Sequence, residues 1–239
     1  MTNTQYRHWV ISEDKKDHGD LARNLAAYTS YPVVVPNYRL TDSDNKLRHP
    51  AHAQDILRLL TFLLSWPGPA GCESPRYDPD KIFLMGHSCS AHMLASIILD
   101  SSEPALVPSP ELLRAIQGVI FSEGIYNIDA LLQSFPTYRD WFIANAFDDL
   151  PNYNPYSVTS MPLREGASHI HWIIIHSRGD DLVDMRQSEG MYENLRSLQG
   201  AGRVLKRWDD LEDGHNAILQ SGKFLQIVGD FILYSATTV

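Results

Sequence analysis

The stretch that decides the fold is Ile82-Phe83-Leu84-Met85-Gly86-His87-Ser88-Cys89-Ser90-Ala91-His92. Its first half is continuously apolar, which is typical of a strand covered on both faces, and a helix is predicted from Ala91 onward. Ser88 lies at the turn between them, with the small residues Gly86 and Ser90 two positions away on either side. This G-x-S-x-S pattern departs from the usual G-x-S-x-G only at its last position and predicts a nucleophile elbow, a tight turn that presents a serine. The alternative interpretation is an ordinary turn in which Ser88 caps a helix.

Strands and helices alternate on both sides of this stretch. Besides the strand at 81–86, apolar runs predict strands at 32–36, 118–122, 171–176 and 203–208. Helical periodicity predicts helices at 56–66, 91–100, 111–116, 128–147, 185–198 and 223–234, and segments 67–79 and 101–110 have the composition of loops. Such alternation is typical of a mostly parallel sheet with helices on both faces, so the sequence predicts one α/β domain over residues 1–239.

Charge balance and cysteine content exclude several classes of protein. The 239 residues carry 20 Lys and Arg against 29 Asp and Glu, a net charge of −9, without a basic cluster suited to nucleic acid. Cys72 and Cys89 are too few for a disulfide framework and lack the spacing of a zinc site. Residues 1–16 do not resemble a secretory signal, and no segment approaches the roughly 18 apolar residues of a membrane span. We expect a cytoplasmic protein with a small-molecule substrate and no nucleic-acid or membrane partner; the oligomeric state is open, a homodimer included.

An elbow serine needs a base that accepts its proton and an acid that orients the base. Asp180 follows the predicted strand 171–176 and is our candidate acid, with Asp181 as the competitor. His215 lies between the last predicted strand and the last predicted helix and is our candidate base. Ser88, Asp180 and His215 thus all follow predicted strands, in the chain order of α/β-hydrolases, and parallel sheets place their sites at that end. The alternative for Asp180 is a helix N-cap without a catalytic role.

Other chemistry has weaker support in the sequence. Cys89 follows the elbow serine, where its backbone N–H is expected to point into an oxyanion hole, and a thiol nucleophile at Cys89 is the less favoured alternative. His169 and His171 have no suitably spaced carboxylate, so we interpret them as packed or surface histidines rather than metal ligands. No G-x-G-x-x-G follows the first strand. The sequence therefore supports neither a metal site at these histidines nor a dinucleotide cofactor.

Several segments together resemble the kynurenine formamidases of the α/β-hydrolase superfamily, in particular the fungal ones. They are 35–40, the elbow 86–92, Glu123-Gly124-Ile125-Tyr126-Asn127 with 128–132 and Pro136-x-Tyr138, then 176–183 and 214–216. The resemblance implies hydrolysis of N-formyl-L-kynurenine to L-kynurenine and formate, a step of tryptophan degradation, without a cofactor. It places the nucleophile, acid and base on Ser88, Asp180 and His215. Tyr126 is our candidate substrate-binding residue, the alternative being ordinary packing.

The sequence departs from that family near its start. These enzymes carry H-G-G-x-W, whose glycines supply part of the oxyanion hole, whereas this chain has Tyr6-Arg7-His8-Trp9, with the tryptophan but neither glycine. The strands that precede this motif in the family have no counterpart, so we expect a fold that is incomplete at its N-terminal edge. Two alternatives to a formamidase follow: a carboxylesterase acting on short acyl esters, and a truncated, catalytically silent hydrolase scaffold.

Overall fold

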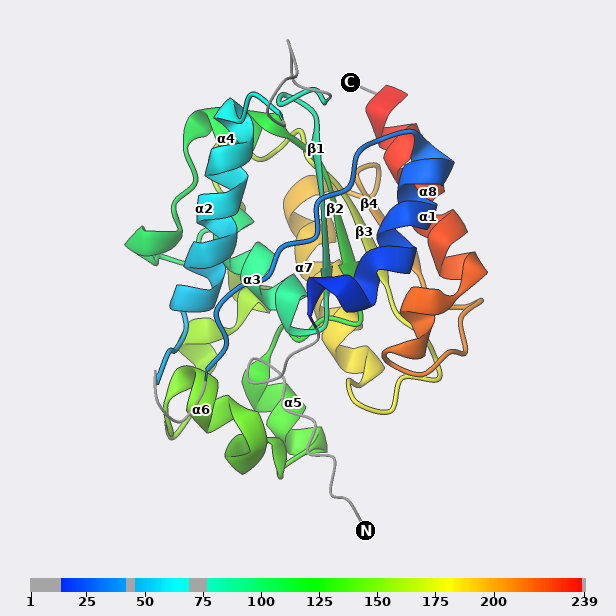
Figure 1. The fold of residues 1–239 in the computed structure, drawn as a ribbon. Helices are drawn as coiled ribbons and strands as arrows, with labels where there is room; N and C mark the ends of the chain where they lie inside the picture. Colours follow the sequence, from blue (N-terminus) through cyan, green and yellow to red (C-terminus); the bar gives the residue numbers. More distant parts are fainter. Residues whose placement is uncertain (1–13, 42–45, 69–76, 238–239) are drawn as a thin grey trace.

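The centre of the protein is a four-stranded parallel sheet (Figure 1). The computed structural model describes residues 14–41, 46–68 and 77–237. The strand order follows the sequence, and the strands are β1 (Ile82–His87), β2 (Ile116–Ser122), β3 (His171–Ile175) and β4 (Val204–Arg207). The four strands predicted at 81–86, 118–122, 171–176 and 203–208 are thereby confirmed.

Helices cover both faces of the sheet, as the alternating pattern predicts (Figure 1). On one face lie α2 (Ala51–Ser65), α3 (Cys89–Ile98) and α7 (Met185–Gln199), whose buried apolar residues belong to the larger of two hydrophobic cores. On the other face, α1 (Gly19–Thr29) packs beside α8 (Gly222–Thr237) over the smaller core. The fold is thus the expected α/β arrangement.

The central strand residues show why both cores form. Val119 and Phe121 of β2 enter the larger core, while Ile120 between them enters the smaller one. In β3, Trp172 and Ile174 face the larger core, and Ile173 and Ile175 face the smaller one. Side chains alternate across a strand, so a continuously apolar strand serves two cores at once. Every residue of β2 and of β3 is buried.

Between β2 and β3 the chain builds a helical lobe at the end of the sheet where α3 begins (Figure 1). The predicted helical stretch 128–147 is confirmed as three consecutive pieces: α5 (Ile128–Ser134), a π-helical turn (Arg139–Ile143) and α6 (Ala144–Phe147). The remaining short elements are α4 (Pro110–Ala115) and 3₁₀ turns at Lys15–His18, Pro104–Leu106, Asn154–Tyr156, Val158–Ser160 and Ala217–Gln220. The lobe therefore lies beside the carboxyl ends of the strands, where the candidate site is expected.

The strand predicted at 32–36 is wrong. This segment passes beside β1 and the start of α3. On its two sides, the Tyr31 ring lies 6.1 Å from that of Phe83 in β1, and the Tyr38 hydroxyl lies 3.7 Å from Cys89 Sγ in α3. It is not assigned to a strand, however, and Val33 and Val34 are exposed. An apolar run becomes a strand only where a neighbour supplies ladder hydrogen bonds, and within the described residues β1 pairs with β2 alone.

Candidate active site

Ser88 occupies a strained turn between β1 and α3. Its φ and ψ angles are 54° and −123°, a region that non-glycine residues rarely adopt. The turn is held by Ser88 N–H, which donates to the Ser122 carbonyl at 2.9 Å, and by the Ser88 carbonyl, which accepts from Ala91 N–H at 3.1 Å. This is the geometry of a nucleophile elbow, because the serine stands at the apex of a sharp strand-to-helix turn.

Gly86 makes this turn sterically feasible. A Cβ at Gly86 would lie 2.8 Å from the backbone nitrogen of Ala91 and 2.8 Å from the carbonyl of Ser90, closer than real Cβ atoms approach such groups. The clash is with backbone, which cannot rotate away as a side chain would. The glycine two residues before the serine is therefore a packing requirement of the elbow.

Asp180 and His215 form a buried pair at the carboxyl ends of β3 and β4. His215 Nδ1 lies 2.8 Å from Asp180 Oδ2, and both side chains are almost fully buried. Asp180 Oδ1 accepts the backbone N–H groups of Leu182 and Val183 at 2.9 and 3.0 Å. The competitor Asp181 is exposed. The structure thus places Asp180, and not Asp181, against the candidate base.

Gly179 allows two loops to touch: the acid loop, residues 176–184 after β3, which carries Asp180, and the base loop, residues 208–216 after β4, which carries His215. A Cβ on Gly179 would lie 2.0 Å from the Glu212 carbonyl oxygen and 2.8 Å from that of Asp213. The two loops also share a backbone hydrogen bond, from Arg178 N–H to the Leu211 carbonyl at 2.8 Å. The short Asp180–His215 contact depends on this close approach.

His87, the residue directly before Ser88, is in contact with this pair. The ring of His87 packs against that of His215 with centroids 4.6 Å apart, and His87 Nδ1 lies 3.1 Å from Ser122 Oγ. The loop after β4 thus reaches the end of β1 although two strands lie between them in the sheet. The direct pairing of Ser88 with His215, and the catalytic roles of Ser88, Asp180 and His215, stay predictions.

Cys89 and Tyr126 are both buried. Cys89 is the first residue of α3, a position whose N–H has no carbonyl acceptor within the helix. Tyr126 belongs to the larger core, with its ring 5.6 Å from that of Phe121, and its backbone N–H donates to Gln187 Oε1 at 2.8 Å. The oxyanion role of Cys89 and the substrate role of Tyr126 stay predictions.

Sequence reasoning missed Glu123 and His176. Glu123 directly follows β2 and is fully buried, and its Oε2 lies 3.3 Å from His215 Nδ1. His176 directly follows β3; its Nδ1 lies 2.8 Å from Ser188 Oγ and its Nε2 3.7 Å from Asp180 Oδ2. The rule that selected Asp180, a polar residue at the end of a core strand, also applies to both of these residues.

Burial shifts the protonation of several groups around the pair. It raises the pKa of Glu123 to about 9, and the negative charge of Asp180 acts in the same direction. It lowers the pKa of His176, which favours the neutral ring. It also raises the pKa of Tyr138 to about 12, and the hydroxyl of this tyrosine donates to the Leu182 carbonyl at 3.1 Å. The acid loop is therefore surrounded by neutral hydrogen-bonding groups.

Among the described residues, His87, Glu123 and His215 offer metal-ligand atoms that all lie within 4.8 Å of one another. His215 already contacts Asp180 through Nδ1, so a metal would have to take Nε2, the nitrogen that a serine hydrolase needs as its base. The other histidine pair is engaged elsewhere: His169 bonds two backbone carbonyls and His171 contacts Arg203. The expectation of a metal-free enzyme stays a prediction.

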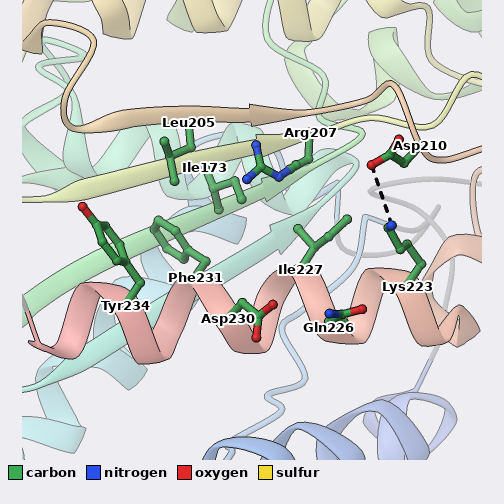
Figure 2. A pocket seen from close by; sticks show the side chains of 10 residues that line it. All are labelled: Ile173, Leu205, Arg207, Asp210, Lys223, Gln226, Ile227, Asp230, Phe231 and Tyr234. Carbon is green, nitrogen blue, oxygen red and sulfur yellow. Dashed lines mark ion pairs between the residues drawn. The ribbon is translucent and has the colours of Figure 1, made fainter.

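A cavity of about 300 Å³ lies on the other side of the sheet, between strands β3 and β4 and helix α8 (Figure 2). An ion pair of Lys223 with Asp210 at 3.7 Å stands at one end of it. Its other lining residues are Ile173, Leu205, Arg207, Gln226, Ile227, Asp230, Phe231 and Tyr234. None of the candidate catalytic residues lines it, so it is separate from the candidate active site.

Comparison with known proteins agrees with this geometry. Residues 8–206 match a family described as having the alpha/beta hydrolase fold. The chain belongs to this α/β-hydrolase family. A solved structure of a putative carboxylesterase from Lactobacillus plantarum WCFS1 superposes with a TM-score of 0.67 at 14% identity, covering 95% of this chain and 81% of that one. The expected fold class is thereby confirmed.

Several similar curated proteins are fungal and are named kynurenine formamidase, and another is the esterase LipQ of Mycobacterium tuberculosis, 24% identical over 198 residues that cover 77% of this chain and 44% of the relative. The one from Saccharomyces cerevisiae is 28% identical over 229 residues, which cover 90% of this chain and 81% of the relative. The one from Meyerozyma guilliermondii is 25% identical over 166 residues, which cover 67% of this chain and 58% of the relative. The suspected likeness to fungal kynurenine formamidases is confirmed, and hydrolase chemistry follows from the family. The segment Tyr6-Arg7-His8-Trp9, where the sequence departs from the expected H-G-G-x-W, lies half inside the family match, which begins at His8, and wholly outside the described residues.

The search for membrane-spanning segments gave no candidate. Over the described ranges, no helix combines the length and the apolarity needed to cross a bilayer.

Proposed function

We propose that the protein is a serine hydrolase that converts N-formyl-L-kynurenine to L-kynurenine and formate. The observation that carries the proposal is the buried 2.8 Å contact of Asp180 with His215 beside an elbow serine, in a chain whose fungal relatives are named kynurenine formamidase. The contact supports the hydrolytic mechanism, and the relatives support the formamide substrate.

The mechanism begins with proton transfer. Asp180 accepts the hydrogen bond from His215 Nδ1–H, which leaves Nε2 unprotonated and able to act as a base. His215 Nε2 takes the proton of Ser88 Oγ while Oγ attacks the formyl carbon. The developing oxyanion accepts a hydrogen bond from the Cys89 N–H at the start of α3, where the helix dipole also favours negative charge.

The second half of the reaction releases both products. The formyl carbon–nitrogen bond breaks, and His215 returns its proton to the aniline nitrogen of the leaving kynurenine. Water, deprotonated by the same imidazole, then attacks the formyl ester on Ser88; the bond from the formyl carbon to Ser88 Oγ breaks, Oγ recovers the proton from His215, and formate leaves. No step requires a metal or an organic cofactor, and the partner of this site is a small molecule.

The decisive experiment replaces the nucleophile. Ser88→Ala is expected to lower kcat for N-formylkynurenine by several orders of magnitude, as removal of a triad serine does elsewhere. Turnover unchanged by this substitution refutes the serine mechanism. Covalent labelling of Ser88 by a fluorophosphonate probe contradicts the silent-scaffold alternative, because labelling requires an activated serine.

The carboxylesterase alternative is tested on substrates. A hydrolase fold with a triad does not fix the acyl group, so kcat/KM is measured side by side for N-formylkynurenine and for a short-chain aryl ester. Preference for the formamide supports the proposal. A strong preference for the ester favours the carboxylesterase instead.

A further inference from the structure

Glu123 is the second carboxyl group against the candidate base. It follows β2, its side chain is fully buried, and its Oε2 lies 3.3 Å from His215 Nδ1. Its Oε1 accepts the backbone N–H of Ser177 at 3.1 Å, which fixes the side chain to the start of the acid loop. A carboxyl group held between the loops of the acid and the base bears directly on how that base is oriented.

The two carboxyl groups cannot share the one proton on His215 Nδ1 equally. Asp180 lies closer to that nitrogen, at 2.8 Å against 3.3 Å, and also receives two backbone N–H groups. As a carboxylate, Asp180 therefore has hydrogen-bond donors for both of its oxygens. Glu123 has one backbone donor, and its Oε2 has no hydrogen-bond partner among the described residues while it is treated as an acceptor only.

A proton on Glu123 resolves this imbalance. Desolvation and the charges of Asp180 and Asp213 raise the pKa of Glu123 to about 9, so the neutral carboxyl prevails at neutral pH. A neutral carboxyl can donate where a carboxylate cannot, and Asp180 is a neighbouring acceptor, because Glu123 Oε2 and Asp180 Oδ2 lie 3.3 and 2.8 Å from the same His215 Nδ1. The Glu123 hydroxyl then supplies Asp180 with a further donor.

The backbone of Glu123 also departs from the ordinary. Its φ angle is +48°, in the left-handed region that favours glycine, so a residue with a side chain is strained there. A glycine would adopt this conformation without strain. The presence of a long carboxylic side chain at this position is explained by what its carboxyl group contacts.

We infer that Glu123 is a positioning residue: as a neutral acid it donates a hydrogen bond to Asp180 and holds the Asp180–His215 pair with a single negative charge. The inference rests on the proposed function, since it assigns Glu123 a part in the same site. A second negative charge beside the imidazole would hold His215 protonated and remove the base. The neutral acid avoids this and fills the space that would otherwise let the ring rotate.

Other titratable groups face this cluster. His87 packs on the ring of His215 from β1, and His176 faces Asp180 from the end of β3. Asp213 acts on Glu123 from the base loop, and Tyr126 lies near enough to Glu123 for the two to interact electrostatically. All of them are retained in the Glu123 variants, so a difference between variants reports on Glu123 alone.

The test compares Glu123→Gln, Glu123→Leu and the exposed control Glu165→Gln in the full chain. Gln keeps an acceptor for Ser177 and a donor for Asp180 but cannot ionise, whereas Leu keeps only the bulk. The titration of the His215 imidazole is followed by nitrogen-15 NMR in the resting protein, and kcat and KM are measured on N-formylkynurenine. Proton release on unfolding is measured between pH 6 and 8.

We expect Glu123→Gln to leave the His215 titration midpoint within about 0.3 pH unit of wild type and kcat within about threefold. Glu123→Leu is expected to lower kcat at least about tenfold with little change in KM, because the base is less well held. Wild type should release about one proton more on unfolding than Glu123→Gln, since Glu123 is neutral when folded and ionised when unfolded. Glu165→Gln should change none of these values.

Two results overturn the inference. A His215 midpoint lowered by one unit or more in Glu123→Gln means that Glu123 is ionised in the wild type, because a neighbouring charge shifts a titration by roughly one to three units. An unchanged kcat in Glu123→Leu means that Glu123 does not position the base. If Glu123→Leu fails to fold, the His215 titration midpoint in Glu123→Gln still tests the inference. If wild type does not turn over the formamide, the proposed function fails, while the NMR and proton-release measurements still test Glu123.

Discussion

Replacing Gly179 with alanine tests whether the approach of two loops creates the catalytic pair. The added Cβ would lie 2.0 Å from the Glu212 carbonyl oxygen, whereas real Cβ atoms essentially never come within 3.0 Å of another group. The backbone of Gly179 lies outside the left-handed region, so the strain is steric alone. The acid loop and the base loop must therefore separate by about 1 Å.

The size of the effect follows from the Asp180–His215 contact. A separation of about 1 Å lengthens that contact from 2.8 Å to about 3.8 Å, beyond hydrogen-bond distance. Misplacement of a catalytic group by 1 Å costs roughly 10²-fold in rate, and complete loss of the acid's orienting role costs roughly 10⁴-fold. We expect kcat for N-formylkynurenine to fall within this range.

The assay compares Gly179→Ala with Gly202→Ala, whose added Cβ would meet nothing within 4 Å. Steady-state kinetics give kcat and KM, and the low-field proton resonance of His215 Nδ1–H reports on the hydrogen bond to Asp180. Gly202→Ala should keep both near wild type. Activity within threefold of wild type in Gly179→Ala, with the resonance intact, would refute the reasoning.

Three further predictions concern the elbow, the buried histidines and metal dependence. Gly86→Ala should abolish labelling of Ser88 by a fluorophosphonate and lower the melting temperature, because its Cβ would lie 2.8 Å from backbone atoms; labelling at the wild-type rate contradicts this. Burial lowers the pKa of His92 to about 4. Unfolded His92 therefore binds a proton below about pH 6.5 that folded His92 does not. The free energy of unfolding should fall as the pH drops from 6.5 to 4, with a shallower slope in His92→Gln; equal slopes exclude His92 as the cause. Dialysis against EDTA should leave kcat/KM unchanged, and a loss restored by Zn²⁺ would show a metal requirement at His87, Glu123 and His215.

Much of the fold could be predicted from local sequence because burial leaves a periodic trace. The continuous apolar runs of β2 and β3 report two covered faces, and these are the strands whose side chains alternate between the two cores. The elbow was predictable for a similar reason, since Gly86 and Ser88 lie within one short turn. The segment 32–36 has the same apolar character but is not a strand, because pairing depends on a neighbour that its own residues do not specify.

The sequence by itself determined where the four core strands lie along the chain, the elbow at Ser88, and the positions of Asp180 and His215 after core strands. Only the tertiary structure decided which carboxylate meets the imidazole: Asp180 at 2.8 Å rather than the adjacent Asp181, with Glu123 at 3.3 Å as a second neighbour. The reason is physical. Periodicity along a chain records whether a residue is buried, but not which distant residue it faces. That choice depends on how loops pack at the sheet edge, where the missing side chain of Gly179 lets two of them touch.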